Sequence, residues 1–258
     1  MDLALVACTM PTIARSTPRS TVLRDTVSGG PAAPFAPVPP SALEESTRSE
    51  GARRVLNIAA ALLGIVLAAP LMACIALLIK LASRGPVLYT QTRVGLDRRS
   101  LRPDLGNGHR HRDHGGKPFT IYKFRTMTPS QGDTEVWATP DDPRVTAVGR
   151  MLRKYRLDEL PQLVNVLRGD MNLVGPRPEQ PAIFAKLRQQ VPGYARRQRV
   201  RPGITGWAQI NHHYDRSIED VHRKVAYDLD YVVRQSLVED LKIMVRTIPV
   251  VVFKQGAW

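Results

Sequence analysis

The sequence is short of cysteine, aromatic residues and acidic residues. Cys8 and Cys74 are the only cysteines in 258 residues, which excludes a disulfide scaffold and fits a reducing compartment. Aromatic residues make up 6% of the chain. The 23 Asp and Glu stand against 37 Lys and Arg, for a net charge of +14. This surplus indicates an anionic partner: nucleic acid, a membrane surface or a phosphorylated substrate.

The first fifty residues contribute nothing to that surplus. They hold four basic and five acidic side chains, so residues 51–258 carry +15. The segment is rich in Pro, Ser, Thr and Ala and has few large apolar side chains to offset the entropy of ordering. We therefore predict that residues 1–52 form a disordered cytoplasmic tail.

One apolar run dominates the chain. From Val55 to Ile79 the only polar side chain is Asn57, and 25 residues suffice for a helix to cross a hydrocarbon layer of about 30 Å. Pro70 interrupts the run, and proline breaks or kinks a helix. Basic residues flank both ends: Arg53, Arg54, Lys80, Arg84 and Arg93. Because such residues favour the cytoplasmic side, we predict a re-entrant helix–break–helix over residues 53–84 that returns to the face it entered.

Residues 85–258 have the pattern of a small cytoplasmic α/β domain, which makes the whole chain α+β and mostly helical. Strands are expected at 86–91 and 119–124, separated by a Gly-, Arg- and His-rich flexible loop at 98–117. Amphipathic helices are expected from Val145 onward and at 181–190, 217–231 and 237–252, the last packed on the core or lying in the membrane interface. The histidines of the loop lack the partner ligands of a metal site, and a solvated loop explains them better.

Asp158 and Glu159 follow a run of cations, and two explanations of the pair are open. Adjacent carboxylates repel unless a metal ion or several cations screen them, so the pair suits a divalent ion and phosphoryl transfer. Alternatively, both carboxylates pair with Arg153 and Arg156 on a solvated helix, which for an isolated Asp-Glu is the commoner case.

Rigid turns beside arginines favour the first explanation. They occur at Gly169-Asp170, Gly175-Pro176-Arg177-Pro178 and Arg201-Pro202-Gly203-Ile204-Thr205-Gly206-Trp207. Proline fixes the backbone, glycine allows close approach, and arginine binds phosphate through two nitrogens. Turn chemistry alone accounts for the Gly and Pro but not for the adjacent Arg.

Nine segments occur in an order and spacing that match a known family. They are Arg53-Arg54, Gly85–Val87, Gln91–Gly95, Lys123–Met127, Asp142–Thr146, Leu157–Leu163, Asn165–Met171, Val174–Glu179 and Arg201–Ile210. Over about residues 53–253 the chain resembles the bacterial sugar transferases, the monotopic polyprenyl-phosphate phosphoglycosyl transferases.

The resemblance implies transfer of a sugar 1-phosphate from a UDP-sugar to polyprenyl (undecaprenyl) phosphate, with release of UMP. It implies that Asp158 is the nucleophile of a covalent phosphosugar intermediate and that Glu159, with Asp158, holds Mg²⁺. It further implies a bacterial inner-membrane protein whose catalytic domain faces the cytoplasm and which starts exopolysaccharide, capsule, O-antigen or glycoconjugate synthesis. The candidates for phosphate contact are Lys123, Arg177 and Arg201, then Arg144 and Arg153.

The chain departs from the family pattern at several positions. Ala69 stands where the family often has Ser before the membrane proline, and Asn57 where an Asp is common. His212-His213 replaces a common Gly-Arg, so His213 becomes a candidate donor-binding residue. Membrane lipids are expected partners and nucleic acid is not; the transferred sugar and homo-oligomer formation are left open. The rival classes are a membrane-tethered, non-catalytic anion-binding or regulatory protein and a nucleic-acid-binding protein, for which the sequence shows no recognition motif.

Overall fold

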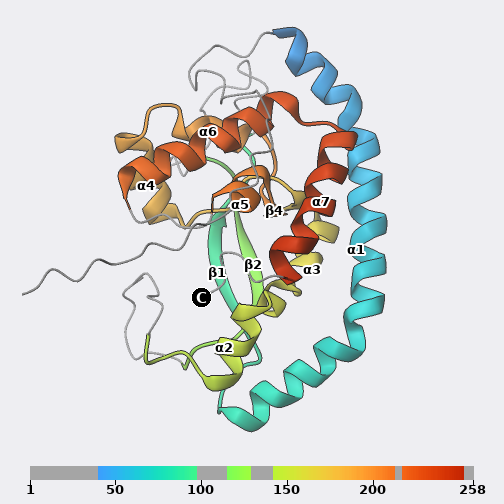
Figure 1. Ribbon diagram of the computed structural model, residues 1–258, viewed down its shortest axis with the longest axis vertical. Coiled ribbons are helices and arrows are strands. Elements are labelled where there is room, and N and C mark those ends of the chain that lie inside the picture. The colour runs from blue at the N-terminus through green and yellow to red at the C-terminus, as the bar shows by residue number, and fades with distance from the viewer. Residues whose placement is uncertain (1–39, 98–114, 129–141, 213–216, 253–258) are drawn as a thin grey trace, which may run out of the picture. The chain divides into compact units, whose positions relative to one another are not determined.

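The computed structural model describes residues 40–97, 115–128, 142–212 and 217–252 (Figure 1). The fold is α+β and mostly helical, as predicted. Its helices are α1 Pro40–Ala82, α2 Ala147–Lys154, α3 Gln162–Arg168, α4 Pro181–Gln190, α5 Trp207–Asn211, α6 Ile218–Arg234 and α7 Leu237–Val252. Two 3-10 helices, η3 Leu157–Glu159 and η4 Tyr194–Arg199, complete the helical elements, and the strands are β1 Leu88–Val94, β2 Pro118–Phe124, β3 Asn172–Val174 and β4 Gly203–Thr205.

The four strands in the described part of the chain form two separate pairs. β1 and β2 are antiparallel, with Gln91 opposite Ile121. Alternate residues of β2 are buried, Phe119 and Ile121 among them, so one face of this pair packs on the core. β3 and β4 are parallel and short, with Val174 opposite Thr205. Both strands predicted from the sequence are confirmed, β1 with its bounds shifted toward Val94.

The predicted amphipathic helices are also confirmed. α4 and α7 have the predicted bounds, and α2 and α6 begin one or two residues after the predicted starts. Thr146 caps α2 by accepting the amide hydrogen of Gly149, and Ser217 forms a capping box with Asp220 at the start of α6. These side chains satisfy amide groups that have no partner inside the helix.

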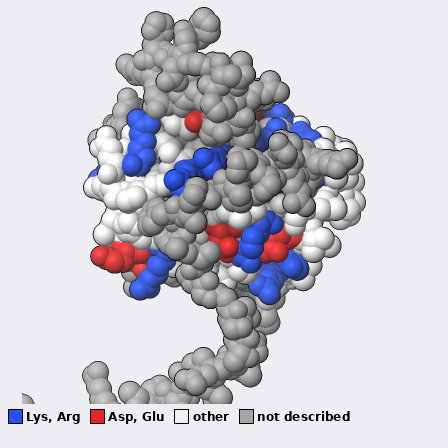
Figure 2. Space-filling model, turned by 90° about the horizontal axis from the view of Figure 1, so that it is seen from above, with Lys and Arg blue, Asp and Glu red and all other residues white. Residues whose placement is uncertain are grey.

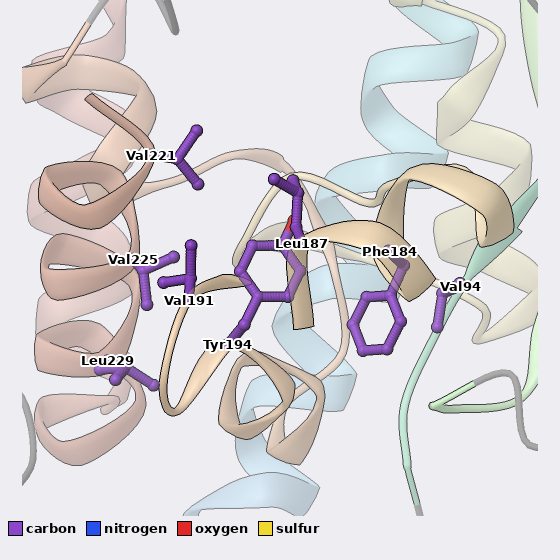
Figure 3. Close-up of a cluster of buried hydrophobic side chains, with 8 residues drawn as sticks. All are labelled: Val94, Phe184, Leu187, Val191, Tyr194, Val221, Val225 and Leu229. Atoms are coloured by element: carbon purple, nitrogen blue, oxygen red, sulfur yellow. The ribbon is translucent and has the colours of Figure 1, made fainter. Parts of the chain in front are cut away.

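One cluster of the hydrophobic core joins α6 to the segment 184–194. Val221, Val225 and Leu229 point from α6 toward Leu187, Val191 and Tyr194 (Figure 3). Phe184 extends the cluster to Val94 of β1, and its ring lies 5.4 Å from that of Tyr194. The cluster therefore ties β1, α4, η4 and α6 together.

Helix α1 differs from the prediction in two ways. It begins at Pro40, inside the segment 1–52 predicted as a disordered tail, while residues 1–39 lie outside the described part of the chain. The predicted break at Pro70 is wrong as a break in secondary structure, because the helix is assigned without interruption through that residue. The helix axis does change direction in its C-terminal part (Figure 1). A proline inside a helix removes one backbone hydrogen bond and can kink the axis without ending the helix.

The apolar part of α1 is long enough to cross a membrane. Within Glu50–Ala82, the most apolar stretch of 18 residues has a mean hydropathy of 2.8, and only 11% of that stretch is buried inside the protein. Val66, Leu67 and Leu81 are 68%, 70% and 76% exposed. A face this apolar and this exposed is typical of a surface that contacts a membrane or another protein.

Polar side chains hold the N-terminal part of α1 to the rest of the protein. Arg53 donates to Asp240 of α7 at 2.8 Å and to the Tyr231 hydroxyl of α6 at 2.7 Å. Arg54 donates to the carbonyl oxygens of Val166 and Leu167 at the end of α3. Buried Asn57 accepts the amide hydrogen of Leu173 in β3 at 2.6 Å. The two arginines predicted as membrane-flanking charges are thus engaged in contacts within the protein.

The C-terminal part of α1 is held mainly by apolar packing. Ile75 and Ile79 are buried against Phe124 of β2 and Leu152 of α2. The Arg125 guanidinium donates to the carbonyl oxygens of Ser83 and Arg84 at 2.9 and 2.7 Å. The N-terminal part of α1 therefore contacts α3, and its C-terminal part contacts α2. These two helices flank Asp158 and Glu159 in the chain.

Candidate active site

Asp158 and Glu159 lie in η3, the short turn between α2 and α3. The backbone leaves α2 through Arg156, which has a φ of 54°. A left-handed conformation is uncommon for a residue other than glycine and often occurs at functional sites. The two carboxylates are 8% and 7% exposed. The alternative of a solvated helix face is therefore wrong.

Glu159 receives two cations through one oxygen. Its Oε1 accepts from Lys123 Nζ of β2 at 3.0 Å and from Arg177 Nη2 at 2.7 Å. The ion-pair partners are thus Lys123 and Arg177, rather than Arg153 and Arg156, which the sequence placed nearby. Within the described part of the chain, the Asp158 carboxylate receives no hydrogen bond and forms no ion pair. One carboxylate of the dyad is neutralised and its neighbour is left available.

The two carboxylates also differ in their pKa. Burial raises the pKa of Asp158, and the adjacent Glu159 charge adds to this effect, while Lys123, Arg177 and Arg153 oppose it. Burial acts in the same direction on Glu159, but the attraction of Arg177 and Lys123 is stronger and lowers the pKa of Glu159. Burial lowers the pKa of Lys123, although the two carboxylates oppose it. The surroundings of the dyad thus shift the pKa values of its two interacting carboxylates in opposite directions.

Arg177 reaches the dyad from a tightly built turn. Gly175 and Gly206 lie so close that a Cβ atom on Gly206 would collide with the Gly175 carbonyl oxygen. This approach brings α5 to Arg177, whose Nη1 donates to Gln209 Oε1 at 3.2 Å. The Arg177 side chain is 38% exposed, so a ligand can reach it. The Gly-Pro-Arg turn singled out from the sequence therefore places a guanidinium beside the dyad.

The remaining predicted phosphate contacts lie in different surroundings. Arg153 donates to Thr126 Oγ1 at 3.0 Å, and its charge acts on Asp158. Arg144 is held by Asp142 at 2.6 Å. Arg201 donates to the Gly169 carbonyl oxygen at 3.2 Å and pairs with Glu50. Of these three, only Arg153 joins Lys123 and Arg177 around the dyad.

His213 and most of the 98–117 loop lie outside the described residues. Two residues at the site were not singled out from the sequence. Gln209 lies in the matched segment 201–210 but carries no charge to draw attention to it, and Thr126 lies in the matched segment 123–127. Their roles depend on contacts with Arg177 and Arg153, which no local pattern reveals.

The described residues hold no cluster of three or more His, Cys, Asp or Glu side chains suited to a metal ion. The dyad alone still fits Mg²⁺, which is commonly bound by one or two carboxylates, with waters and substrate phosphates completing its shell. Asp158 has no competing donor among the described residues, and the side chains of Lys123 and Arg177 donate to Oε1 of Glu159. Both carboxylates therefore have oxygens to offer.

The charges on the surface are mixed in sign. On the face in Figure 2, the described Lys and Arg side chains lie beside Asp and Glu side chains and do not form one continuous basic patch. Some of the basic side chains thus form ion pairs within the protein, as Arg53 and Arg177 do.

The fold and the dyad define the class to which the chain belongs. Residues 48–254 match the model of the family described as bacterial sugar transferase, and the chain belongs to this family. It is 42% identical over 199 residues to the UDP-glucose:undecaprenyl-phosphate glucose-1-phosphate transferase of Escherichia coli K12, covering 76% of this chain and 39% of that protein.

Two further relatives are similar in degree. A UDP-N-acetylgalactosamine-undecaprenyl-phosphate N-acetylgalactosaminephosphotransferase of Aeromonas hydrophila is 41% identical over 80% of this chain and 44% of its own length. A UDP-glucose:undecaprenyl-phosphate glucose-1-phosphate transferase of Caulobacter vibrioides is 43% identical over 80% of this chain and 72% of its own. The chain thus spans about two fifths of the first two relatives, whose names carry different sugars.

Proposed function

We propose that this protein transfers a sugar 1-phosphate from a UDP-sugar to polyprenyl phosphate, releasing UMP. The observation that carries the proposal is the division of the buried dyad: Glu159 is neutralised by Lys123 and Arg177, while Asp158 keeps a carboxylate without a donor among the described residues. The names of the relatives, which are UDP-sugar:undecaprenyl-phosphate transferases, support the same reaction. The product would start the membrane stage of exopolysaccharide, capsule, O-antigen or glycoconjugate synthesis.

Asp158 is the nucleophile in the proposed first step. One of its oxygens forms a bond to the phosphorus that bears the sugar, and the bond from that phosphorus to the oxygen bridging to UMP breaks. UMP leaves with the electron pair. Lys123 and Arg177 lie beside Asp158 and can donate to the oxygens of the transferring group, offsetting the charge that builds up there.

The second step returns Asp158 to its starting state. An oxygen of the polyprenyl phosphate attacks the same phosphorus, and the bond between phosphorus and the Asp158 carboxylate breaks. The product is a polyprenyl diphosphate sugar, and Asp158 is again an ionised carboxylate. Burial, which keeps water away from the adduct, favours transfer to the lipid over hydrolysis.

Asp158 and the second oxygen of Glu159 are the proposed Mg²⁺ ligands. The ion would supply charge neutralisation to the diphosphate. Because Lys123 and Arg177 bind the other Glu159 oxygen, they hold that carboxylate ionised and oriented.

We propose that α1 dips into the cytoplasmic leaflet of the bacterial inner membrane and returns to the same face. The 25-residue apolar run would be about 37 Å long as a helix, yet Arg53 contacts Asp240 at one end and Arg125 binds the Ser83 carbonyl oxygen at the other. A straight crossing would place these two contacts on opposite sides of a layer of about 30 Å. The exposed stripe Val238, Leu241, Val245 and Ile248 of α7 would lie in the same interface.

Labelling with a membrane-impermeant maleimide tests this topology. Cys8 and Cys74 are first replaced by serine, and Gly51→Cys and Arg84→Cys, both at exposed positions, are introduced one at a time. We expect inside-out vesicles to label both and right-side-out vesicles to label neither. Labelling of the two positions from opposite sides would overturn the re-entrant topology and leave the reaction untouched.

The reaction is tested with purified protein, Mg²⁺ and a panel of UDP-sugars without lipid acceptor. We expect UMP release of up to one equivalent and a phosphosugar mass increase on the peptide containing Asp158. Asp158→Asn should abolish both, whereas Asp170→Asn, a carboxylate outside the dyad, should not. A parent protein that is inactive with every donor, with acceptor present, would favour a non-catalytic anion-binding protein instead.

A further inference from the structure

The backbone of the turn that carries Arg177 is hydrogen-bonded by residues outside the dyad. The loop that carries Arg177 leaves β3, and the amide of Gly203 in β4 donates to the Pro176 carbonyl oxygen at 3.0 Å. Beyond that point the backbone is held by β1: the Val94 amide donates to the Glu179 carbonyl oxygen at 2.9 Å, and Arg93 donates to the Pro178 carbonyl oxygen at 3.2 Å. Each carbonyl from 176 to 179, except that of Arg177 itself, is thus bound by β1 or β4.

The Arg177 carbonyl oxygen is bound by a buried side chain. Arg197 of η4 is 1% exposed, and its Nη2 donates to this oxygen at 3.1 Å. The same guanidinium donates through Nε to Asp228 of α6 at 2.6 Å and through Nη1 to the Tyr194 hydroxyl at 2.8 Å. The guanidinium therefore donates one hydrogen bond to each of three groups, which lie in three segments of the chain.

Burying such a cation costs free energy of folding, so a gain in stability alone does not explain it. An apolar pair of similar volume is often as stable as a buried ion pair or more stable, and the neighbouring cluster of α4, η4 and α6 is apolar (Figure 3). Tyr194 belongs to that cluster, and the guanidinium also stacks 4.9 Å from its ring centroid. The geometry of a planar fork, which lysine lacks, is what allows one side chain to reach all three partners.

We propose that Arg197, oriented by Asp228 and Tyr194, is a positioning residue: it fixes the backbone at Arg177 and so keeps the Arg177 guanidinium beside Glu159. The chain of contacts is short. Arg197 binds the carbonyl oxygen of the residue whose own side chain binds Glu159 at 2.7 Å. Testing this role by enzyme kinetics rests on the proposed function, whereas testing it by hydrogen exchange does not.

Arg197→Lys is the informative substitution, because it keeps a charge opposite Asp228 but cannot bridge three partners. We expect kcat to fall at least tenfold with little change in KM for the donor. Tyr194→Phe, which keeps the ring in the core and removes one partner of the guanidinium, should cause a smaller loss. The matched control is Val225→Ala, which weakens the same core cluster and removes no hydrogen-bond partner of the Arg197 guanidinium.

A double-substitution cycle separates positioning from stability. If Arg197 acts through Arg177, then Arg197→Lys should cost nothing further in an Arg177→Ala background. Independent, multiplicative losses would overturn the proposal. So would a loss in Val225→Ala as large as that in Arg197→Lys, since this would make the effect one of general destabilisation.

Hydrogen exchange gives a readout that does not depend on turnover. In Arg197→Lys we expect faster exchange in the peptide covering residues 175–180, while Val225→Ala should leave this peptide no faster than the rest of the core. Unchanged exchange in that peptide would overturn the proposal. If the parent protein proves inactive with every donor, the proposed reaction fails, and the exchange result alone decides whether Arg197 fixes the Arg177 turn.

Discussion

Carboxylates are buried in two different ways in this protein. Asp240, at the seat of α1, receives a guanidinium from Arg53 and a hydroxyl hydrogen from Tyr231. Asp158, at the dyad, is similarly buried but receives no donor among the described residues. An ionised group without a partner is costly to bury. The ion pair of Asp240 thus stabilises the attachment of α1. Asp158 lacks such a partner within the described residues, and its carboxylate can bind a ligand.

The largest expected effect is at the unsatisfied carboxylate. Asp158→Asn should lower transferase activity by at least about three orders of magnitude, because the amide is a poor nucleophile. It should not lower the free energy of unfolding, because the substitution removes a buried charge next to Glu159. Activity assays and urea unfolding in detergent measure both. A strongly destabilised but active variant would reverse the comparison.

The opposite pattern is expected at the satisfied carboxylate. Asp240→Asn leaves the Arg53 charge buried without its counterion, which should cost about 3–5 kcal/mol of the free energy of unfolding. Replacing both, with Arg53→Met and Asp240→Leu, should recover most of that loss. Lys242→Met, at an exposed pair with Glu239, is the control and should cost less than about 1 kcal/mol. Urea midpoints in detergent provide the comparison.

A pH titration tests a third carboxylate, that of the half-buried Glu179. Burial opposes its ionisation, but Lys224 and Arg197 outweigh burial and lower the pKa of Glu179 from 4.5 to about 2. Because the folded state holds the lower pKa, the stabilisation is present above about pH 4.5 and is lost as the pH falls toward 2. The shift corresponds to about 3 kcal/mol. In Glu179→Gln the free energy of unfolding should vary less over this range; an unchanged slope would show that other groups carry it.

The smallest effect is expected at Arg144. Its guanidinium is held by Asp142, whose pKa this contact lowers to about 2. Since that guanidinium is already engaged by Asp142, which is only 5% exposed, Arg144→Gln should change activity by less than about twofold. A tenfold loss in activity would instead place Arg144 among the groups that contact the phosphates.

Local pattern was enough to predict the longer elements. The bounds of α4 and α7 follow from amphipathic spacing and from the proline that begins α4, and the hairpin follows from alternating side chains. The short elements were not predicted. β3 and β4 are three residues each, too short to show a period, and η3 depends on the left-handed backbone at Arg156.

The site was predicted only as far as residue types allow. Sequence motifs singled out Lys123 and Arg177, which lie 36 and 18 positions from the Glu159 they bind. They singled out Arg201 equally, yet its side chain pairs with Glu50 and Gly169. Nothing local distinguishes an arginine that faces a ligand from one that holds a backbone carbonyl, because that choice is made by contacts between distant segments.

The attachment of α1 also sets an order of events during synthesis. The ribosome makes α1 before the other described helices and strands. Asp240, the partner of Arg53, comes 187 positions after it, while Arg125, which binds the other end, follows Ser83 by only 42. The C-terminal end of the helix can therefore be docked while its N-terminal end still waits for its counterion. Until the last helices leave the ribosome, Arg53 must remain in water or among lipid head groups. On the proposed membrane placement of α1, lipid would contact this helix before the protein's own core is complete.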